Sequence, residues 1–329
     1  MLGIDVSKDS LSCALRDQTT RQLLWEIDVP NSPDGVSVLL EKTPSQTHWV
    51  VEPTGRYSTR VVQQARDAGQ SVLLAPPRKA RAFLQSLQSR AKTDKLDGRG
   101  LALFGLSQTL PAYPLKEAAL DTIDQLLSAR KGLSGSITKL QLQQKELSQA
   151  ASFLSEVIAD LKQRLKQLDK EIARQSAATP KMQAAKELEK VPGIGPVTAT
   201  AVTARLASKS FAHPDQFVAY VGLDVSICES GKYKGQRGLT HQGDAELRRL
   251  LYVCAQANQR CKASPFKTQY EREREKGMSS TAALCAVARK LARVCWSLHK
   301  HGTAYDSARV NQQPKPEKPL ATEPKTVIS

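Results

Sequence analysis

The sequence of 329 residues lacks any run of about 18 apolar residues, the length that a membrane-spanning helix requires. It opens directly into Leu2-Gly3-Ile4-Asp5-Val6 and lacks the apolar core of a secretory signal peptide. These two absences predict a soluble, cytoplasmic protein with no membrane partner.

Metal-binding patterns of cysteine and histidine are also missing. The six cysteines form no CxxC pair and show no spacing with histidine that is typical of a zinc site. We therefore expect reduced, mostly buried thiols. The cysteines are Cys13, Cys228, Cys254, Cys261, Cys285 and Cys295.

Acidic residues are scarce relative to basic ones: 32 Asp and Glu stand against 48 Lys and Arg, a formal charge of +16. The imbalance is uneven, because residues 190–310 hold 19 basic against 9 acidic residues, whereas residues 1–110 hold 14 against 11. Each phosphate that a basic side chain neutralises adds affinity for a polyanion. Nucleic acid is therefore the expected partner.

Patterns of strand and helix alternate over the first 110 residues. Strands are predicted at 2–6, 10–15, 22–29, 48–51 and 71–75, and helices at 33–42, 59–68 and 77–88. The first three strands read as an antiparallel meander. With the later alternation they predict an α/β domain, a mixed sheet covered by helices.

Four carboxylates stand out in this region. Asp94 and Asp97 are three residues apart, so on a helix they share one face, although alone they would indicate only a solvated, charged helix. Asp5 and Glu52 end predicted strands, and each alone would also fit a cap or turn. Carboxylates gathered at a sheet end raise one another's pKa unless they bind hard divalent cations. We therefore treat the four as a candidate metal site.

A leucine stripe follows the α/β region. Leucines recur every seven residues from Leu126 to Leu168, which predicts a long helical coiled coil between protomers, with a hairpin inside one chain as the alternative. Gln144 interrupts the seam as a register-setting residue would. Gly132 and Gly135 are expected to break or bend the helix near its start.

Two candidate nucleic-acid contacts lie further along. Residues 188–201 fit a helix-hairpin-helix element whose Gly193 and Gly195 leave backbone N–H groups to hold a phosphate, or else a purely structural hairpin. Residues 229–238 form a basic loop with Ser230, and amphipathic helices are predicted at 244–260 and 279–299. Lys232, Lys234 and Arg237 are the candidate phosphate contacts of this loop. Residues 311–329, rich in Pro, Lys and Glu, predict a disordered tail.

Three segments carry a resemblance to a known family. The sequence resembles the insertion-sequence transposases of the "IS one-ten" family, which includes Piv-type DNA invertases. The segments are Gly3-Ile4-Asp5-Val6-Ser7-Lys8, Val51-Glu52-Pro53-Thr54-Gly55-Arg56-Tyr57 and Lys92-Thr93-Asp94-Lys95-Leu96-Asp97. The resemblance implies a RuvC-like, ribonuclease-H-type fold in residues 1–110. It also implies that Asp5, Glu52, Asp94 and Asp97 form a DEDD tetrad that binds Mg²⁺ or Mn²⁺.

The resemblance extends to the C-terminal transposase domain of that family. Ser230-Gly231 matches the Ser-Gly pair whose serine is the nucleophile. His241-Gln242 departs from a Lys-Arg pair common in relatives, and the role of His241 stays open, as a base or as a polar contact. The resemblance also implies donor and target DNA as partners, and a guide non-coding RNA.

We therefore expect a DNA transposase or site-specific recombinase that cuts and rejoins strands. The expected domains are a catalytic domain (1–110), a coiled coil (111–188), a mainly α C-terminal transposase domain (189–310) and the tail (311–329). We expect a dimer that becomes a tetramer on nucleic acid, associated with the nucleoid when acting. Two alternatives remain: a RuvC-like junction resolvase that uses water, and a nucleic-acid-binding protein without catalysis.

Overall fold

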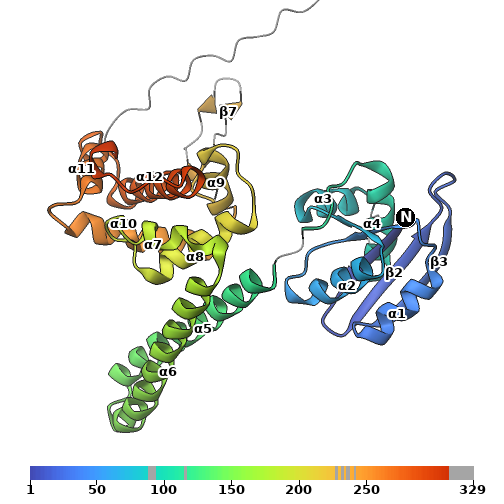
Figure 1. The fold of residues 1–329 in the computed structure, drawn as a ribbon, viewed down its shortest axis with the longest axis horizontal. Coiled ribbons are helices and arrows are strands. Elements are labelled where there is room, and N and C mark those ends of the chain that lie inside the picture. Colours follow the sequence, from blue (N-terminus) through green and yellow to red (C-terminus); the bar gives the residue numbers. More distant parts are fainter. Residues whose placement is uncertain are drawn as a thin grey trace, which may run out of the picture. The chain divides into compact units, whose positions relative to one another are not determined.

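The computed structural model describes residues 1–87, 94–114, 117–226, 229–230, 233–234, 238–240 and 242–310 (Figure 1). For residues 94–97, 226, 229–230 and 233–234 it describes the backbone alone. The chain forms two compact units, Met1–Lys116 and Glu117–Ser329. The predicted tail at 311–329 lies outside the described residues. None of the described helices has the length and apolar character needed to cross a bilayer.

A five-stranded mixed sheet is the centre of the first unit. Its order is β3 (Leu23–Pro30), β2 (Ser10–Arg16), β1 (Leu2–Val6), β4 (His48–Val51) and β5 (Ser71–Leu74). The first three strands pair antiparallel, while β4 runs parallel to both β1 and β5. The predicted meander and mixed sheet are therefore confirmed.

Helices cover both faces of this sheet. They are α1 (Pro33–Lys42), α2 (Arg56–Asp67), α3 (Pro77–Leu87) and α4 (Asp94–Ser107). Because strand residues alternate between faces, Ile4 joins a core with α1 and α2, whereas Val50 joins a second core with α3 and α4. Helix α2 begins three residues before the predicted Thr59, since its exposed first residues carry no apolar periodicity.

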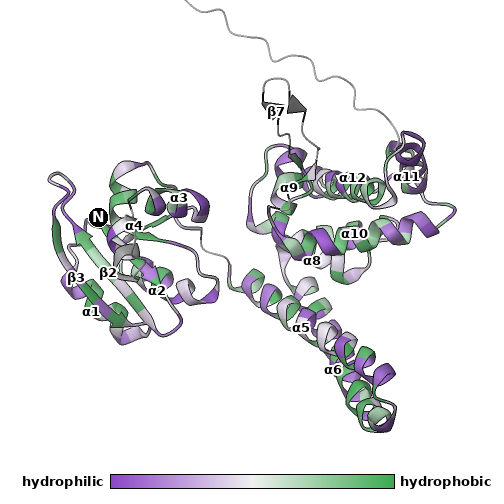
Figure 2. Ribbon diagram, turned by 180° about the vertical axis from the view of Figure 1, so that it is seen from behind, coloured by the Kyte–Doolittle hydropathy of each residue, from purple (hydrophilic) through white to green (hydrophobic). Residues whose placement is uncertain are grey.

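A helical hairpin begins the second unit. Helices α5 (Ala118–Glu146) and α6 (Ala151–Ala178) pack on each other and are joined by a 3₁₀ turn, Ser148–Ala150 (Figure 1). Hydrophilic and hydrophobic residues alternate along both helices (Figure 2). The seam therefore closes within one chain, as in the alternative that we weighed, and association between protomers stays a prediction.

The structure corrects the predicted helix break at Gly132 and Gly135 and adds contacts for Gln144. Helix α5 runs without interruption through Gly132 and Gly135, because packing against α6 outweighs the roughly 1 kcal/mol propensity cost of a glycine. Gln144 contacts the turn of its own hairpin, and its role in setting the register between protomers stays a prediction. Its side-chain amide donates to the Ala151 carbonyl at 3.2 Å and to Ser155 Oγ at 2.6 Å, which stabilises the turn of the hairpin.

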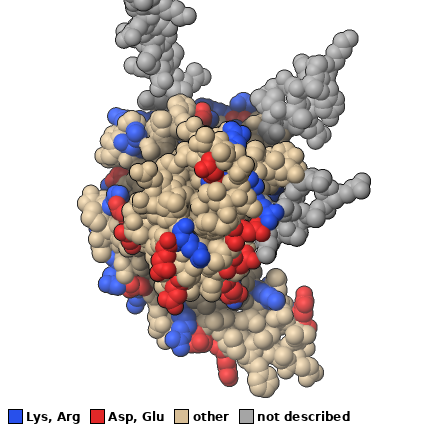
Figure 3. All heavy atoms as spheres, turned by 90° about the vertical axis from the view of Figure 1, so that its right-hand side faces the viewer, with Lys and Arg blue, Asp and Glu red and all other residues tan. Residues whose placement is uncertain are grey.

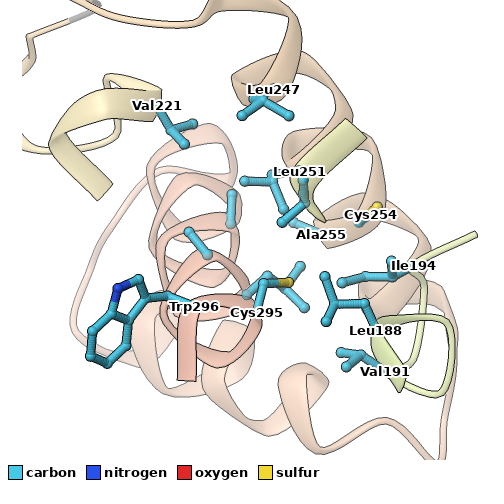
Figure 4. Close-up of a cluster of buried hydrophobic side chains, with 14 of the residues drawn as sticks. Leu188, Val191, Ile194, Val221, Leu247, Leu251, Cys254, Ala255, Cys295 and Trp296 are labelled. Atoms are coloured by element: carbon cyan, nitrogen blue, oxygen red, sulfur yellow. The ribbon is translucent and has the colours of Figure 1, made fainter. Parts of the chain in front are cut away.

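The C-terminal helices form one continuous core. They are α7 (Ala184–Leu188), α8 (Pro196–Ser208), α9 (Pro214–Val221), α10 (Ala245–Arg260), α11 (Pro265–Glu275) and α12 (Ser280–His301). Helix α12 lies among the others, and Figure 4 shows its Cys295 turned toward Leu188 and Cys254. The predicted helices at 244–260 and 279–299 are confirmed within two residues. Helix α11 went unpredicted because its polar sequence is held mainly by the buried Phe266.

The charge of the chain is distributed over the surface with both signs. On the face drawn in Figure 3, basic and acidic side chains are interspersed, and neither sign forms a continuous patch there. The net charge therefore does not by itself locate a nucleic-acid surface, and local groups of side chains have to be considered.

Candidate active site

Asp5 and Glu52 come to the same end of the sheet. Strands β1 and β4 are parallel neighbours in which Ile4 pairs with Val51, so Asp5 and Glu52 follow at the same level. Both side chains are half-buried. Adjacent parallel strands lie about 4.8 Å apart, which places the two backbones within reach of a shared ligand.

Both carboxylates belong to the face of the sheet that α4 covers. A Cβ on Gly3 would lie 2.2 Å from the Gly98 carbonyl oxygen, so Gly3 points at α4, and Asp5 shares its face. A Cβ on Gly105 of α4 would lie 2.5 Å from the Val50 side chain. Because side chains alternate between the two faces, Glu52, two residues after Val50, belongs to the same face.

The first turn of α4 lies at the level of Asp5. A Cβ on Gly98 would lie 2.7 Å from the Ser12 carbonyl oxygen, and Ser12 is the partner of Asp5 in the β1–β2 pair. Only residues without a Cβ permit this approach of helix to sheet. Asp94 and Asp97 belong to this first turn, with backbone described and side chains not. The fold thus brings the backbones of all four predicted ligands to one end of the sheet.

An ion pair connects the start of α4 to β3, the edge strand of the sheet. Arg99 Nε and a second guanidinium nitrogen donate to the two carboxylate oxygens of Glu26 on β3, at 2.5 and 2.6 Å. This hydrogen bond raises the pKa of Arg99. About a third of each side chain is exposed, so the pair orients α4 more than it stabilises the fold.

Asp28 is a further acid on this face that the sequence patterns did not single out. The sheet register aligns Asp28 with Ser12, and Ser12 with Asp5, across three neighbouring strands. Burial raises the pKa of the Cys13 thiol, and the charges of Asp28 and Asp5 raise it further. Only the strand register reveals this alignment, because 22 residues separate Asp28 from its nearest predicted partner in the sequence.

The oxygen-only set fits a hard cation such as magnesium. The four predicted ligands are carboxylates, and the sheet register places two of them side by side at the strand ends. Among the described side chains, no three His, Cys, Asp or Glu are grouped as a metal site. Of the tetrad, only Asp5 and Glu52 have described side chains, so the metal site stays a prediction.

Ser230 lies on a short β-arm of the second unit. Strand β6 (Val225–Ser226) pairs with β9 (Gly238–Leu239), and β7 (Glu229–Ser230) pairs with β8 (Tyr233–Lys234) so that Ser230 faces Tyr233 in the register. Only the backbone of Ser230 and Lys234 is described. The predicted contacts Lys232 and Arg237, like Gly231 and His241, lie outside the described residues.

The base of this arm is anchored to the helices. The Thr240 backbone N–H donates to the Asp224 carbonyl at 3.1 Å, and the Thr240 hydroxyl donates to the Asp224 carboxylate. Asp244 then caps α10 by accepting from the N–H groups of Glu246 and Leu247 at 3.0 and 3.1 Å. The arm therefore ends at a fixed helix start.

A buried arginine connects this helix start with the hairpin. Arg205 of α8 donates from Nε to Asp244 at 3.0 Å and pairs through another nitrogen with Asp124 of α5. Burial lowers the pKa of Arg205, but the two carboxylates outweigh it and the net shift is upward. The three side chains are 12 to 22% exposed. The ion triad thus joins α5, α8 and the end of the serine arm.

The predicted phosphate-binding turn connects α7 to α8. Gly193 has a φ of +79°, and a Cβ there would lie 2.4 Å from the Asn258 amide nitrogen. Asn258 is buried and donates to the Pro192 carbonyl at 2.7 Å, which holds the turn against α10. Gly195 is the N-cap of α8 and provides no side-chain cap. The geometry permits a phosphate at this helix start, and its binding stays a prediction.

Comparisons with known proteins identify two family domains in the chain. Residues 2–151 match a family described as "Transposase", the DEDD domain of IS110, and this range contains all four predicted ligands. Residues 185–271 match the "Transposase IS116/IS110/IS902 family", a range that contains Gly193, Gly195 and Ser230.

Curated relatives cover most of the chain. The pilin gene-inverting protein of Moraxella bovis is 24% identical over 316 residues, which are 93% of this chain and 97% of that protein. The protein of the same name from Moraxella lacunata is 24% identical over 315 residues, with the same coverage. The transposase of insertion sequence element IS1328 from Yersinia enterocolitica is 31% identical over 124 residues, 37% of each chain.

Proposed function

Because this chain carries both domains of IS110-type transposases and belongs to that family, we propose that it cuts and rejoins DNA strands with a carboxylate tetrad and a serine nucleophile. The relatives' names describe gene inversion and transposition. Both processes need breakage and rejoining of strands, so this shared step is the activity that we assign.

The observation that carries the proposal is the convergence at one sheet end. Asp5 and Glu52 end adjacent parallel strands, and the turn with Asp94 and Asp97 lies on the same face. These four residues would hold Mg²⁺ or Mn²⁺. Such cations stabilise the charge that develops on the attacking and leaving oxygens of a phosphoryl transfer. The strand ends and the helix turn that carry these residues are held rigid by the core, and they would fix the position of the cation.

Ser230 is the proposed nucleophile. Its Oγ forms an ester with the scissile phosphate while the bond from phosphorus to the oxygen of the leaving strand breaks. The serine proton passes to a tetrad carboxylate, which returns it to that oxygen, so the strand leaves with a hydroxyl group. The covalent ester conserves the phosphodiester energy, so a strand hydroxyl can reverse the step without an external energy source. Lys232, Lys234 and Arg237 would hold phosphate oxygens.

Ser230 and the tetrad are more than 130 residues apart in the sequence. The proposal therefore requires that the serine arm and the tetrad act on one phosphate when nucleic acid is bound, from the same chain or from two protomers. Donor and target DNA are the proposed substrates, and a guide non-coding RNA is the proposed specificity partner. Dimers, and tetramers on nucleic acid, are the proposed assemblies.

A junction resolvase is the competing function. It would use the same carboxylates to activate water, and Ser230 would then be dispensable. A protein that only binds nucleic acid would need neither. Metal-dependent cleavage separates a protein that only binds nucleic acid from the other two functions, and a covalent link between protein and DNA separates the proposed recombinase from the resolvase.

The deciding experiment traps that link. Labelled DNA, guide RNA, Mg²⁺ and the full chain are incubated, denatured and separated, with wild type compared with Ser230→Ala and Ser230→Cys. We expect a denaturant-resistant adduct in wild type and none in Ser230→Ala. Ser226→Ala, a serine of the same arm, is the matched control and should keep the adduct.

Two outcomes would reject the assignment. If Ser230→Ala still forms the adduct at the wild-type rate, another residue is the nucleophile. If wild type cuts DNA with Mg²⁺ but never forms an adduct, water is the nucleophile and the resolvase function replaces the one proposed here.

A further inference from the structure

A concave site adjoins the core drawn in Figure 4, which contributes Trp296 to its lining. It has a volume of about 420 Å³ and lies between the end of α8, the loop that follows it, and the last turns of α12. A volume of this size falls within the range of about 300 to 1,000 Å³ that ligand sites occupy. Its lining residues are Lys181, Leu206, Ala207, Ser208, Lys209, Ser210, Phe211, Trp296, His299 and Lys300.

The charge of this site has one sign. Three lysines line it, and none of its lining residues is an aspartate or glutamate. Glu117, which lies outside the lining, pairs with Lys181, so Lys209 and Lys300 are the candidate phosphate contacts. The site therefore attracts an anion more strongly than the mixed surface around it does.

An aromatic wall stands beside the lysines. Trp296 points away from the aliphatic core (Figure 4), and its indole N–H donates to the Phe211 carbonyl at 3.1 Å. The Phe211 ring lies 5.3 Å from the ring of Phe217 and 5.4 Å from that of Tyr220, which fixes its position. Lys209 Nζ lies 4.6 Å from the Tyr220 ring centre. Contacts with Phe217 and Tyr220 thus fix the Phe211 ring, and Tyr220 also contacts Lys209.

The neutral polar groups of the site suit a nucleotide. His299 is half-buried, and burial together with Lys300 lowers its pKa, so at neutral pH its imidazole is uncharged and can accept or donate a hydrogen bond. Ser208 and Ser210 add hydroxyl groups at the rim. Cations for phosphate, a ring for stacking and neutral hydrogen-bonding groups are the elements that recognise single-stranded nucleic acid.

We propose that this site binds one unpaired nucleotide of a nucleic acid strand, with its phosphate at Lys209 and Lys300 and its base against Phe211. Duplex DNA keeps its bases inside the stack, so a concave site of this kind takes a single strand or a flipped nucleotide. The proposal rests on the proposed function only for the identity of the polyanion. It adds a binding site distinct from the carboxylate tetrad, the serine arm and the α7–α8 turn.

Binding of labelled single strands tests the proposal. The full chain is titrated, without divalent metal, into fluorescein-labelled dT12 and U12, and anisotropy is read over a range of salt concentrations. Lys209→Gln with Lys300→Gln should weaken binding roughly tenfold and reduce the salt slope by about 0.7, since each phosphate neutralised on a single strand contributes about 0.7 and the site holds one phosphate. Phe211→Leu, which keeps an apolar side chain, should weaken binding at least about fivefold.

The control removes the same charge elsewhere. Lys190→Gln with Lys276→Gln changes the net charge equally, but each of these lysines already lies beside a glutamate. Thermal unfolding checks that every variant is folded. Weaker binding of one or both strands by the site variants alone supports the proposal, and the strand that is affected identifies DNA or RNA as the source.

Three results would overturn the proposal. They are wild-type affinity of the site variants for both strands, an equal loss in the control pair, and direct binding of a labelled acidic peptide where neither oligonucleotide binds. Failure here differs from failure of the proposed function. A chain that forms the serine adduct while the site variants bind normally refutes only the nucleotide site. A chain that binds through the site but never cuts DNA refutes only the catalytic assignment.

Discussion

Asp5 lies near the end of one central strand of a five-stranded sheet and Glu52 directly follows its neighbour, whereas Ser230 lies on a two-residue strand of an arm whose base is joined to the helices. The carboxylates derive their positions from strand register and from contact between Gly3 and Gly98. The serine derives its position from Asp224, Thr240 and an ion triad. The proposed cation site thus lies on a rigid sheet, whereas the proposed nucleophile lies on an arm, a division suited to an active site that is completed on the substrate.

The largest effect is expected when the proposed cation site is disrupted. Asp5→Asn keeps the size of the side chain but removes a ligand charge, and should lower strand cleavage at least about 10³-fold, as should excess chelator. DNA binding, measured by gel shift, should persist because most of the excess basic charge lies in residues 190–310. Glu41→Gln, on α1 and the opposite face of the sheet, is the control. Full cleavage in chelator would exclude a metal site.

The next effect tests whether close packing aligns the tetrad. Gly98→Ala places a Cβ 2.7 Å from the Ser12 carbonyl, so α4 must shift. A displacement of about 1 Å at a catalytic group can cost about 10²-fold in rate. We expect that loss in single-turnover cleavage, with retained far-UV circular dichroism. Unchanged cleavage would mean that α4 does not position the ligands.

Two arginine variants compare the anchors of the two regions. Arg205→Met removes the guanidinium that Asp124 and Asp244 share, and should lower the free energy of unfolding by about 2–3 kcal/mol, with less serine adduct at equal DNA binding. Arg99→Met breaks the more exposed pair with Glu26 and should cost about 0–1 kcal/mol. Urea denaturation measures both, and equal losses would contradict the comparison.

The hairpin can be tested for association between protomers. Phe153 and Val157 are 75% and 49% exposed and lie on one face of α6, so Phe153→Glu with Val157→Glu should separate a dimer without unfolding the hairpin. Leu154→Glu with Leu161→Glu introduces charge into the half-buried seam and should unfold it instead. Light scattering and helicity distinguish the two cases. An unchanged mass for the first pair would place the interface elsewhere.

The smallest effect is the counterpart of the Gly98 variant. Gly132→Ala adds the same methyl group inside a helix, but nothing lies within 4 Å of it. The free energy of unfolding should rise by up to about 1 kcal/mol because alanine has the higher helix propensity. Cleavage should not change. A loss of stability would show that Gly132 has a partner outside this chain.

Much of the first unit could be predicted from local patterns. Alternating apolar residues gave all five strands and two of the helices within one residue, and α2 within three, because strand and helix periods differ and one face of each element is buried. The acids at 5, 52, 94 and 97 were found in the same way, from strand ends and a three-residue spacing. The two family domains that match the chain are transposase domains, which agrees with the enzyme class predicted from the sequence.

Tertiary structure decided what local patterns could not. A seven-residue repeat has the same form whether its partner is another chain or the same chain reversed, and the turn at Ser148–Ala150 with its Gln144 hydrogen bonds selects the hairpin. Asp28 joins the acidic face only through pairing across three strands. The Arg205 triad and the lysine-lined site each gather residues far apart in sequence. Periodicity is fixed by the backbone geometry of each element, whereas these groups depend on how elements pack.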